Sequence, residues 1–233
     1  MGGEKADIRE HPWQVAFSIG TPGSPMLCGG SLVADRWVLT AAHCFHATAQ
    51  PDVVRVKAGA SDYRQRGGWG EAEKIVMHEG YDAKTHENDL ALVKLKSPPA
   101  GEIIPLATPE VQPHTCDMLE VTGWGRTAEG APAAAVLQRA SVPYVENSIC
   151  NAPEAYKGAI KDGMMCAGYH DGGVDACQGD SGGPLVLRGA DGPVLIGVVS
   201  WGEGCARKLK FGVYTRVSAY RDWIAKTIVS DPD

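Results

Sequence analysis

The chain has 233 residues, a length that suits either one large β domain or two small ones. Its 29 glycines and 15 prolines make turn-forming residues frequent, so we expect many short segments joined by tight turns. The net charge of -6 removes the usual electrostatic reason to expect nucleic acid or an anionic membrane surface as a partner.

Short segments rich in apolar and β-branched residues recur along the chain and predict strands. In chain order they are Trp13–Ile19, Trp37–Thr40, Val53–Val56, Leu90–Leu95, Val194–Val199 and Val213–Val217. Turn-forming clusters such as Thr21–Ser24 and Ala190–Pro193 lie between them, without a repeat or a linker-like charge block. The pattern predicts a compact all-β fold.

One helix is predicted, over residues 218–229, and it closes the chain. Apolar residues recur there at spacings of three and four, as on one face of a helix: Tyr220, Trp223, Ile224 and Ile228. Ser218 stands near the start, where its hydroxyl is expected to cap the helix. A single helix after an all-β chain is expected to dock on the exterior.

The cysteines and the absence of long apolar runs bear on the compartment. No apolar run approaches the roughly 20 residues that cross a bilayer, and Met1–Glu10 lacks a signal-like stretch, so any export signal is expected to have been removed. The seven cysteines form no paired CxxC motif of the zinc-ribbon kind. We expect disulfides, with one thiol left over, and an extracytoplasmic location: extracellular, periplasmic or in a granule.

The segment Gly179–Pro184, with the sequence Gly-Asp-Ser-Gly-Gly-Pro, is the most specific signal in the chain. Glycines on both sides of Ser181 allow a sharp turn that exposes its hydroxyl. The same turn lets the N–H groups of Gly179 and Ser181 point to one spot, as an oxyanion requires. Without further context, an ordinary glycine-rich turn explains this segment equally well.

A serine nucleophile needs an imidazole as base and a carboxylate behind that imidazole. Among the seven histidines, His43 ends a strand-like segment and is followed at once by Cys44. Asp89 stands immediately before the strand-like Leu90–Leu95. Each residue by itself also fits a purely structural role.

Three motifs occur together in the order His, Asp, Ser: Thr40–Cys44, Asn88–Leu92 and Gly179–Pro184. In this order the chain resembles the trypsin-like serine proteases of the chymotrypsin family, whereas subtilisins and α/β-hydrolases order the same residues differently. The likeness extends from Gly2-Gly3 to Gly212-Val213-Tyr214. It implies a His43, Asp89 and Ser181 triad that hydrolyses peptide bonds through an acyl-enzyme.

The resemblance also implies the architecture, namely two packed six-stranded antiparallel β-barrels with a C-terminal α-helix. One peptidase unit would cover residues 1–233, with the first barrel at about residues 15–110 and the second at about 118–216. The active site would lie where the barrels meet. We expect a monomer.

The resemblance places Asp175, six residues before Ser181, at the base of the pocket that receives the side chain before the cleaved bond. A buried carboxylate there predicts polypeptide substrates with Arg or Lys at that position. Ala176 stands where trypsins commonly carry Ser, which removes a hydroxyl that could bind a Lys ammonium and predicts a preference for Arg over Lys. The other substrate-binding residues that the resemblance implies are Gln178, Ser200, Trp201, Gly202 and Gly212. Protein protease inhibitors are further expected partners, whereas nucleic acid and membranes are not.

The resemblance also implies a pairing of the cysteines, which the sequence itself leaves open. The implied disulfides are Cys28–Cys44, Cys150–Cys166 and Cys177–Cys205, with Cys116 as the free thiol. Residues 58–73 are shorter than the calcium loop of animal trypsins and offer no matching ligands, so we expect no required metal and no cofactor.

The amino terminus departs from the family pattern. In the family, the Asp before the nucleophile, here Asp180, pairs with the ammonium group of an Ile- or Val-led amino terminus. Gly2-Gly3 match the family glycines, so Met1 takes the second position of that start and the leading residue is missing. The alternative to an active enzyme is therefore a catalytically impaired protease-fold binding protein or a zymogen-like form.

Overall fold

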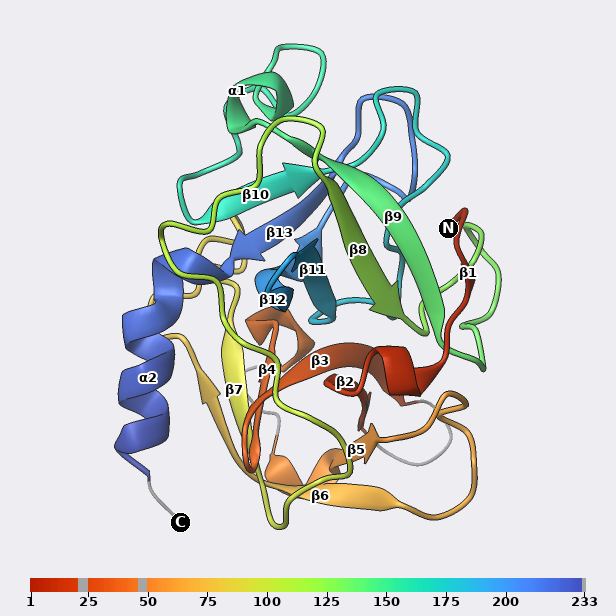
Figure 1. Ribbon diagram of the computed structural model, residues 1–233, viewed down its shortest axis with the longest axis vertical. Coiled ribbons are helices and arrows are strands. Elements are labelled where there is room, and N and C mark those ends of the chain that lie inside the picture. The colour runs from red at the N-terminus through yellow and green to blue at the C-terminus, as the bar shows by residue number, and fades with distance from the viewer. Residues whose placement is uncertain (21–24, 46–49, 232–233) are drawn as a thin grey trace.

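Strands dominate the computed structural model, which describes residues 1–20, 25–45 and 50–231. The described residues form thirteen strands and two α-helices (Figure 1). Each of the six predicted strand segments overlaps a strand of the structure, whereas the predicted turn at Thr21–Ser24 lies outside the described residues.

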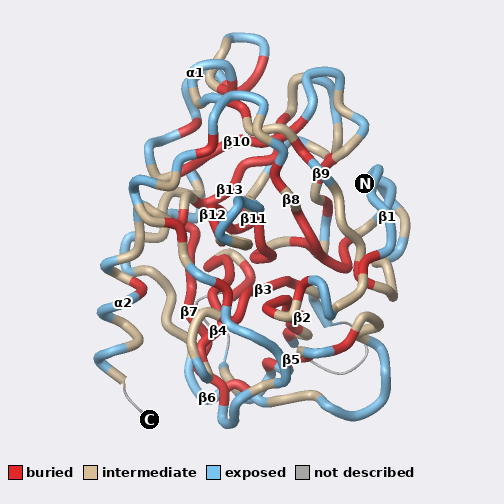
Figure 2. The backbone as a smooth tube through the Cα atoms, in the orientation of Figure 1, coloured by how far each residue is buried: buried red, intermediate tan, exposed pale blue. Residues whose placement is uncertain are grey.

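Six strands of the first half close into an antiparallel barrel in the order β2-β3-β4-β7-β6-β5. Their bounds are β2 Gln14–Ile19, β3 Met26–Ala34, β4 Trp37–Thr40, β5 Val54–Ala58, β6 Trp69–Met77 and β7 Ala91–Leu95. Side chains such as Phe17, Leu39 and Leu92 fill its interior and are fully buried. In Figure 2, β4 and β7 are buried along most of their length, whereas β6 is mostly intermediate or exposed.

The second barrel closes in the same antiparallel manner, through β8-β9-β10-β13-β12-β11 and back to β8. Its strands are β8 Met118–Gly123, β9 Gln138–Val145, β10 Met164–Ala167, β11 Pro184–Gly189, β12 Gly192–Trp201 and β13 Gly212–Arg216. A short strand, β1 (Glu4–Lys5), adds to the outer edge of β9. The predicted fold class, two six-stranded barrels with a C-terminal helix, is confirmed.

The two barrels meet through small residues and buried polar contacts. A Cβ atom built on Gly29 of β3 would lie 2.8 Å from the Cα atom of Gly183, so only glycine lets these backbones approach. Between the barrels, Thr122 of β8 donates a buried hydrogen bond of 2.5 Å to the side-chain oxygen of Gln14. The loop before β11 is thereby held against the first barrel.

The C-terminal helix crosses back to the first barrel although it follows the last strand of the second (Figure 1). The predicted cap at Ser218 is wrong, because a 3-10 turn, Val217–Tyr220, includes this residue and α2 starts only at Arg221. α2 (Arg221–Val229) buries Ile224 in the core of the first barrel. The other α-helix, α1 (Asn147–Cys150), is a single turn.

Candidate active site

The three residues of the predicted triad come from three separate segments that meet where the barrels join. His43 lies on a 3-10 turn, Ala42–Cys44, directly after β4. Asp89 lies two residues before β7, and Ser181 lies in the loop before β11. The Cys28–Cys44 disulfide anchors the turn that carries His43 to β3.

His43 and the carboxylate of Asp89 are joined by two hydrogen bonds, one from the backbone and one from the imidazole. The backbone N–H of His43 donates to Asp89 Oδ1 at 2.8 Å, and Nδ1 lies 2.7 Å from Oδ2. Since an ionised carboxylate only accepts hydrogen bonds, the proton of this ring sits on Nδ1 and the lone pair on Nε2.

Two residues of the second barrel hold Asp89 in place. Ser200 donates from its hydroxyl to Asp89 Oδ2 at 2.5 Å, and Thr215 donates to the main-chain oxygen of Asp89 at 2.8 Å. Burial of the Asp89 carboxylate raises its pKa, but the hydrogen bonds from His43 and Ser200 outweigh burial and the pKa falls below its ordinary value. Asp89 is therefore ionised at neutral pH despite being inaccessible to solvent.

Contacts with the first barrel hold the loop of Ser181 beside the turn of His43. Gly29 donates its N–H to the main-chain oxygen of Ser181 at 2.7 Å. A Cβ atom on Gly182, which has a φ of 79°, would overlap the hydroxyl of Thr40, three residues before His43. The sulfur of Cys44 lies 3.7 Å from the main-chain oxygen of Ser181. Within the described residues, no hydrogen bond joins the Ser181 hydroxyl to the imidazole.

The turn around Ser181 leaves two N–H groups without a partner. Gly179 has a φ of 100°, a conformation that favours glycine. The N–H groups of Gly179 and Ser181 form no hydrogen bond to any described residue, whereas that of the intervening Asp180 donates to Cys177 at 2.9 Å. Two unpaired donors flanking one nucleophile are the arrangement that an oxyanion needs.

Asp180 lies behind this turn with its carboxylate fully enclosed. It accepts hydrogen bonds from the N–H groups of Gly125 at 2.7 Å and Cys177 at 3.0 Å. Burial raises the pKa of Asp180, and the two backbone donors act against that increase. The ammonium group of Met1 donates to the main-chain oxygen of Asp175 at 2.5 Å, and among the described residues no ion pair joins it to Asp180.

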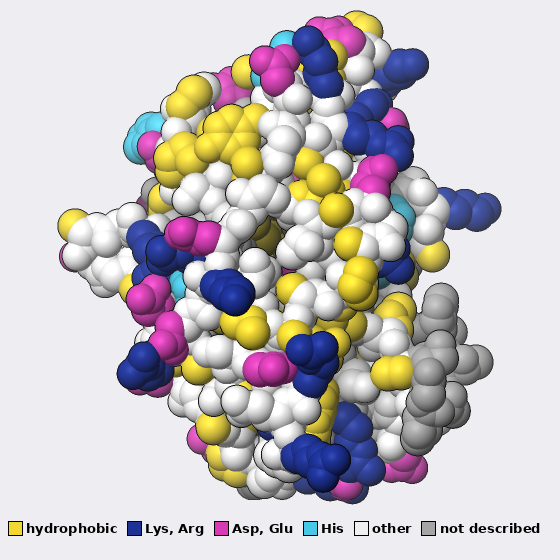
Figure 3. Space-filling model, turned by 90° about the vertical axis from the view of Figure 1, so that its right-hand side faces the viewer, with side chains coloured by type: hydrophobic (Ala, Val, Ile, Leu, Met, Phe, Trp, Pro, Cys, Tyr) yellow, Lys and Arg dark blue, Asp and Glu magenta, His cyan; other side chains and the backbone are white. Residues whose placement is uncertain are grey.

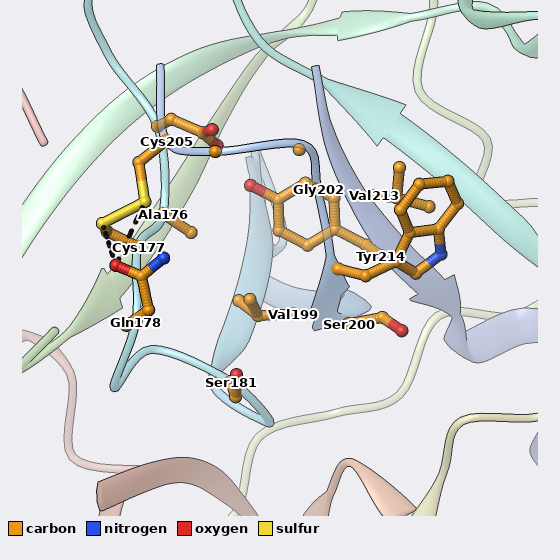
Figure 4. A pocket seen from close by; sticks show the side chains of 14 residues that line it. Ala176, Cys177, Gln178, Ser181, Val199, Ser200, Gly202, Cys205, Val213 and Tyr214 are labelled. Atoms are coloured by element: carbon orange, nitrogen blue, oxygen red, sulfur yellow. Dashed lines mark hydrogen bonds between the residues drawn. A yellow bond between two sulfur atoms is a disulfide. The ribbon is translucent and has the colours of Figure 1, made fainter. Parts of the chain in front are cut away.

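A pocket opens beside Ser181, and Asp175 is one of the residues that line it. Its walls come from residues 175–178, from the end of β12 and from the start of β13. Figure 4 shows the ring of Tyr214 near the centre of the view, with Ala176 and Cys177 to one side of it and Ser181 below. All the predicted substrate-binding residues line this pocket: Asp175, Ala176, Gln178, Ser200, Trp201, Gly202 and Gly212.

Asp175 is a buried carboxylate with an incomplete set of hydrogen bonds. Its Oδ2 accepts from the N–H of Ala206 at 3.0 Å, but Oδ1 has no partner among the described residues. Burial raises the pKa of Asp175 to about 6, against the opposing effect of the Ala206 hydrogen bond. A Cβ atom on Gly212 would lie 2.7 Å from Oδ1, so glycine leaves space beside this oxygen.

Two contributions were not evident from the sequence. Ser200, predicted as a substrate-binding residue, directs its hydroxyl to Asp89 instead of into the pocket. The sequence does not single out His86 among the seven histidines, yet its ring lies 6.1 Å from that of His43 and stacks on Trp201. The one sequence feature that hints at a place near the triad is its position three residues before Asp89.

The structure contains the three disulfides that the resemblance implies, with sulfur–sulfur bonds at Cys28–Cys44, Cys150–Cys166 and Cys177–Cys205. The last of these joins two walls of the pocket. Cys116 carries a free thiol and is exposed.

Comparison with known proteins points to one family. The model of the family described as Trypsin matches residues 1–224. Mouse transmembrane protease serine 11C is 42% identical over 230 residues, which cover 96% of this chain and 52% of that protein. The chain thus spans about half the length of this relative. The name of this relative describes a transmembrane protease, so the comparison does not support the expectation that membranes are not partners.

Within the described residues, every helix is too short or too polar to cross a bilayer.

Proposed function

Because the chain belongs to the trypsin family of serine proteases, we propose that it is an endopeptidase that cleaves polypeptides after Arg or Lys, with His43, Asp89 and Ser181 as its catalytic triad. The observation that carries this proposal is the buried Asp175 carboxylate, which lines the pocket beside Ser181 and has one oxygen without a hydrogen-bond partner among the described residues. A cationic side chain is the occupant that removes the cost of burying this charge.

The proposed reaction begins with attack of the Ser181 hydroxyl oxygen on the scissile carbonyl carbon. Nε2 of His43 takes the hydroxyl proton, because the Nδ1 proton is already donated to Asp89. Asp89 stabilises the imidazolium that forms. The charge on the former carbonyl oxygen is stabilised by the N–H groups of Gly179 and Ser181.

Collapse of this intermediate releases the first product. His43 returns its proton to the leaving nitrogen, the peptide bond breaks, and the acyl group remains on Ser181 as an ester. Water then attacks the ester carbonyl, again with His43 as base, and the carboxylic acid product leaves with the serine regenerated. No group other than the triad and the two backbone donors is needed.

The preference for Arg over Lys rests on Ala176. A guanidinium group reaches a carboxylate with two parallel N–H donors, whereas a lysine ammonium relies on additional oxygen acceptors near the pocket base. Ala176 lines the pocket and supplies no hydroxyl. We therefore propose a preference for Arg.

The setting proposed for the enzyme is extracytoplasmic, in keeping with its three disulfides. Its partners would be polypeptide substrates and protein protease inhibitors that occupy the same pocket. On the face shown in Figure 3, basic and acidic side chains are interspersed, which supports the expectation that nucleic acid is not a partner. A monomer is sufficient for the proposed chemistry, because every site residue comes from one chain.

A second candidate is a zymogen-like or catalytically impaired form. It is favoured by the surroundings of Asp180. The carboxylate of Asp180 accepts hydrogen bonds from two backbone N–H groups, and among the described residues it forms no ion pair with a cation. In that form the pocket and the oxyanion donors would be incompletely ordered, and substrates would bind without efficient turnover.

The test is hydrolysis of peptide amides that end in Arg, Lys, Phe or Ala by the purified protein, with Ser181→Ala as the control for contaminating protease. We expect the order Arg, then Lys, with Phe and Ala far slower. Faster cleavage of the Phe amide would refute the role of Asp175. If turnover appears only in a variant with Ile added before Met1, the second candidate describes the chain as it stands.

A further inference from the structure

A cluster beside the proposed triad has the chemistry of a metal site. One nitrogen each from His43 and His86 and one oxygen from Asp89 lie within 4.8 Å of one another. His86 takes no part in the proposed reaction. We propose that a zinc-class divalent transition-metal ion binds between His43 and His86 and reversibly blocks the enzyme; the blocking of turnover, but not the binding, rests on the proposed function.

The loop that carries His86 is well ordered by its own hydrogen bonds. The N–H of His86 donates to the main-chain oxygen of Asp82 at 2.8 Å, and Asp82 in turn accepts from Lys84 at 2.7 Å through its side chain. His86 has a φ of 57°, a left-handed conformation that His and Asn tolerate better than most residues. The backbone therefore presents this imidazole at a defined place.

The ring of His86 is held between two aromatic partners. It stacks on Trp201 with an angle of 22° between the planes, and it meets His43 edge to face at 90°. Stacking on Trp201 accounts for the orientation of the ring but not for its polar atoms. Nδ1 of His86 is buried and has no hydrogen-bond partner among the described residues. A buried nitrogen without a partner is a ligand atom available for an ion.

Both imidazoles have a lone pair to donate. The proton of His43 lies on Nδ1 toward Asp89, so Nε2 is free. The buried Nδ1 of His86, which has no hydrogen-bond partner among the described residues, supplies the second nitrogen. Neutral imidazole is the form of histidine that binds metals.

The distances fit an ion after a small side-chain movement. Zinc–nitrogen bonds of about 2.0–2.1 Å place two tetrahedral ligands about 3.3 Å apart. One nitrogen of His86 lies within 4.8 Å of one nitrogen of His43, so this pair of atoms needs to approach by about 1.5 Å or less. Rotation of the partly exposed His86 ring accommodates a shift of this size. Water from the open cleft would complete the coordination.

Asp89 serves this site as a second-layer partner rather than as a ligand. A carboxylate that accepts the other ring N–H of a ligating histidine orients the ring and raises its basicity. Asp89 makes this contact with His43 at 2.7 Å. Its buried negative charge also offsets part of the charge of the ion.

An ion bound to Nε2 of His43 would block the proposed reaction. Nε2 of His43 is the atom that takes the proton of Ser181 in the proposed reaction, and a metal bound there leaves no base. The ion would also stand beside Trp201, in the path of the substrate. This ion is distinct from a required metal, because it suppresses turnover and its removal by a chelator restores it.

Binding is tested without any catalysis. Zn²⁺ is titrated by calorimetry into the Ser181→Ala, Cys116→Ser protein, in which the nucleophile and the exposed thiol are removed. We expect one ion per chain at micromolar concentration. His86→Asn, which suits the left-handed backbone but lacks the imidazole, should weaken binding at least about tenfold, the lower limit for loss of even a second-layer partner.

Two further variants complete the binding test. His43→Asn should weaken Zn²⁺ binding as His86→Asn does, whereas the matched control His170→Asn, at an exposed histidine paired with Asp171, should leave it unchanged. Thermal unfolding without metal checks that each variant is folded. Equal Zn²⁺ affinity of the parent and folded His86→Asn would overturn the proposal, as would absence of binding to the parent.

The inhibition is measured separately on the Cys116→Ser protein with an intact Ser181. Zn²⁺ should lower kcat/KM for an Arg amide at least tenfold, EDTA should reverse the effect, and His86→Asn should resist it relative to its own rate without metal. Normal turnover that Zn²⁺ does not affect would overturn the proposed block. If Zn²⁺ binds in calorimetry but no amide is hydrolysed, the proposed function fails and the metal site stands.

Discussion

Replacing Asp175 with Asn is the perturbation that separates function from stability at this site. The variant keeps the shape of the side chain and removes its charge. Losing one partner of a buried, hydrogen-bonded charge pair costs about 2–5 kcal/mol. Since about 1.4 kcal/mol is a factor of ten, kcat/KM for an Arg amide should fall roughly 30- to 4,000-fold. Hydrolysis of a Phe amide should fall far less.

The same substitution should stabilise the protein without substrate. Burial raises the pKa of Asp175 from 3.8 to about 6, so the folded protein holds this carboxylate in its charged form at a cost. At about 1.36 kcal/mol for each pKa unit, the cost is about 3 kcal/mol at neutral pH. Asn at position 175 has no charge to bury, so the free energy of unfolding should rise by an amount of this order.

The pH dependence has a definite sign. Between pH 3.8 and about 6 the folded state binds more protons at Asp175 than the unfolded state does, so stability from this group decreases as the pH rises. The full cost is present above about pH 6 and disappears below the unfolded pKa. The gain in stability of Asp175→Asn should therefore be largest at pH 7 and small at pH 4.

Urea denaturation at pH 4 and pH 7 measures the stability difference, and initial rates on Arg and Phe amides measure the activity. The matched control is Asp191→Asn, at an exposed position of the β11–β12 hairpin, which should change neither. An Asp175→Asn protein that is less stable than the parent at pH 7, or equally active on Arg, would refute the reasoning.

Three further substitutions test the rest of the site. Ser181→Ala should lower kcat by roughly 10⁶-fold with an unchanged fold, as measured by burst kinetics and circular dichroism, and a smaller loss would argue against a serine nucleophile. Ala176→Ser adds an acceptor for an ammonium group, so the ratio of kcat/KM for Arg over Lys amides should fall about tenfold, the effect of one hydrogen bond to a charged group; an unchanged ratio would count against the assignment. Ser200→Ala removes the 2.5 Å hydrogen bond to Asp89 and should lower the free energy of unfolding by about 1.5–3 kcal/mol in urea, whereas full stability would mean that water replaces the hydroxyl.

Local signals were sufficient for six of the thirteen strands and for the sharp turn around Ser181. Segments such as Leu90–Leu95 predict strands because side-chain alternation and β-branched content act within a few residues. The glycines around Ser181 likewise report a sharp turn, and the structure shows the left-handed conformation at Gly179 and Gly182. The order of the three motifs then indicated the family and hence the two barrels.

Features that depend on contacts between distant segments were decided only by the tertiary structure. The hydroxyl of Ser200 meets Asp89 across 111 positions of sequence, and no local pattern distinguishes it from a strand serine facing the pocket. Ser218 has the composition of a helix cap, but packing of Val217 in the core draws the chain into a 3-10 turn before the helix. His86 gains its place beside His43 and Trp201 only when the barrels close. Sequence patterns report the preferences of a few neighbouring residues, whereas these contacts arise from the three-dimensional packing of the whole chain.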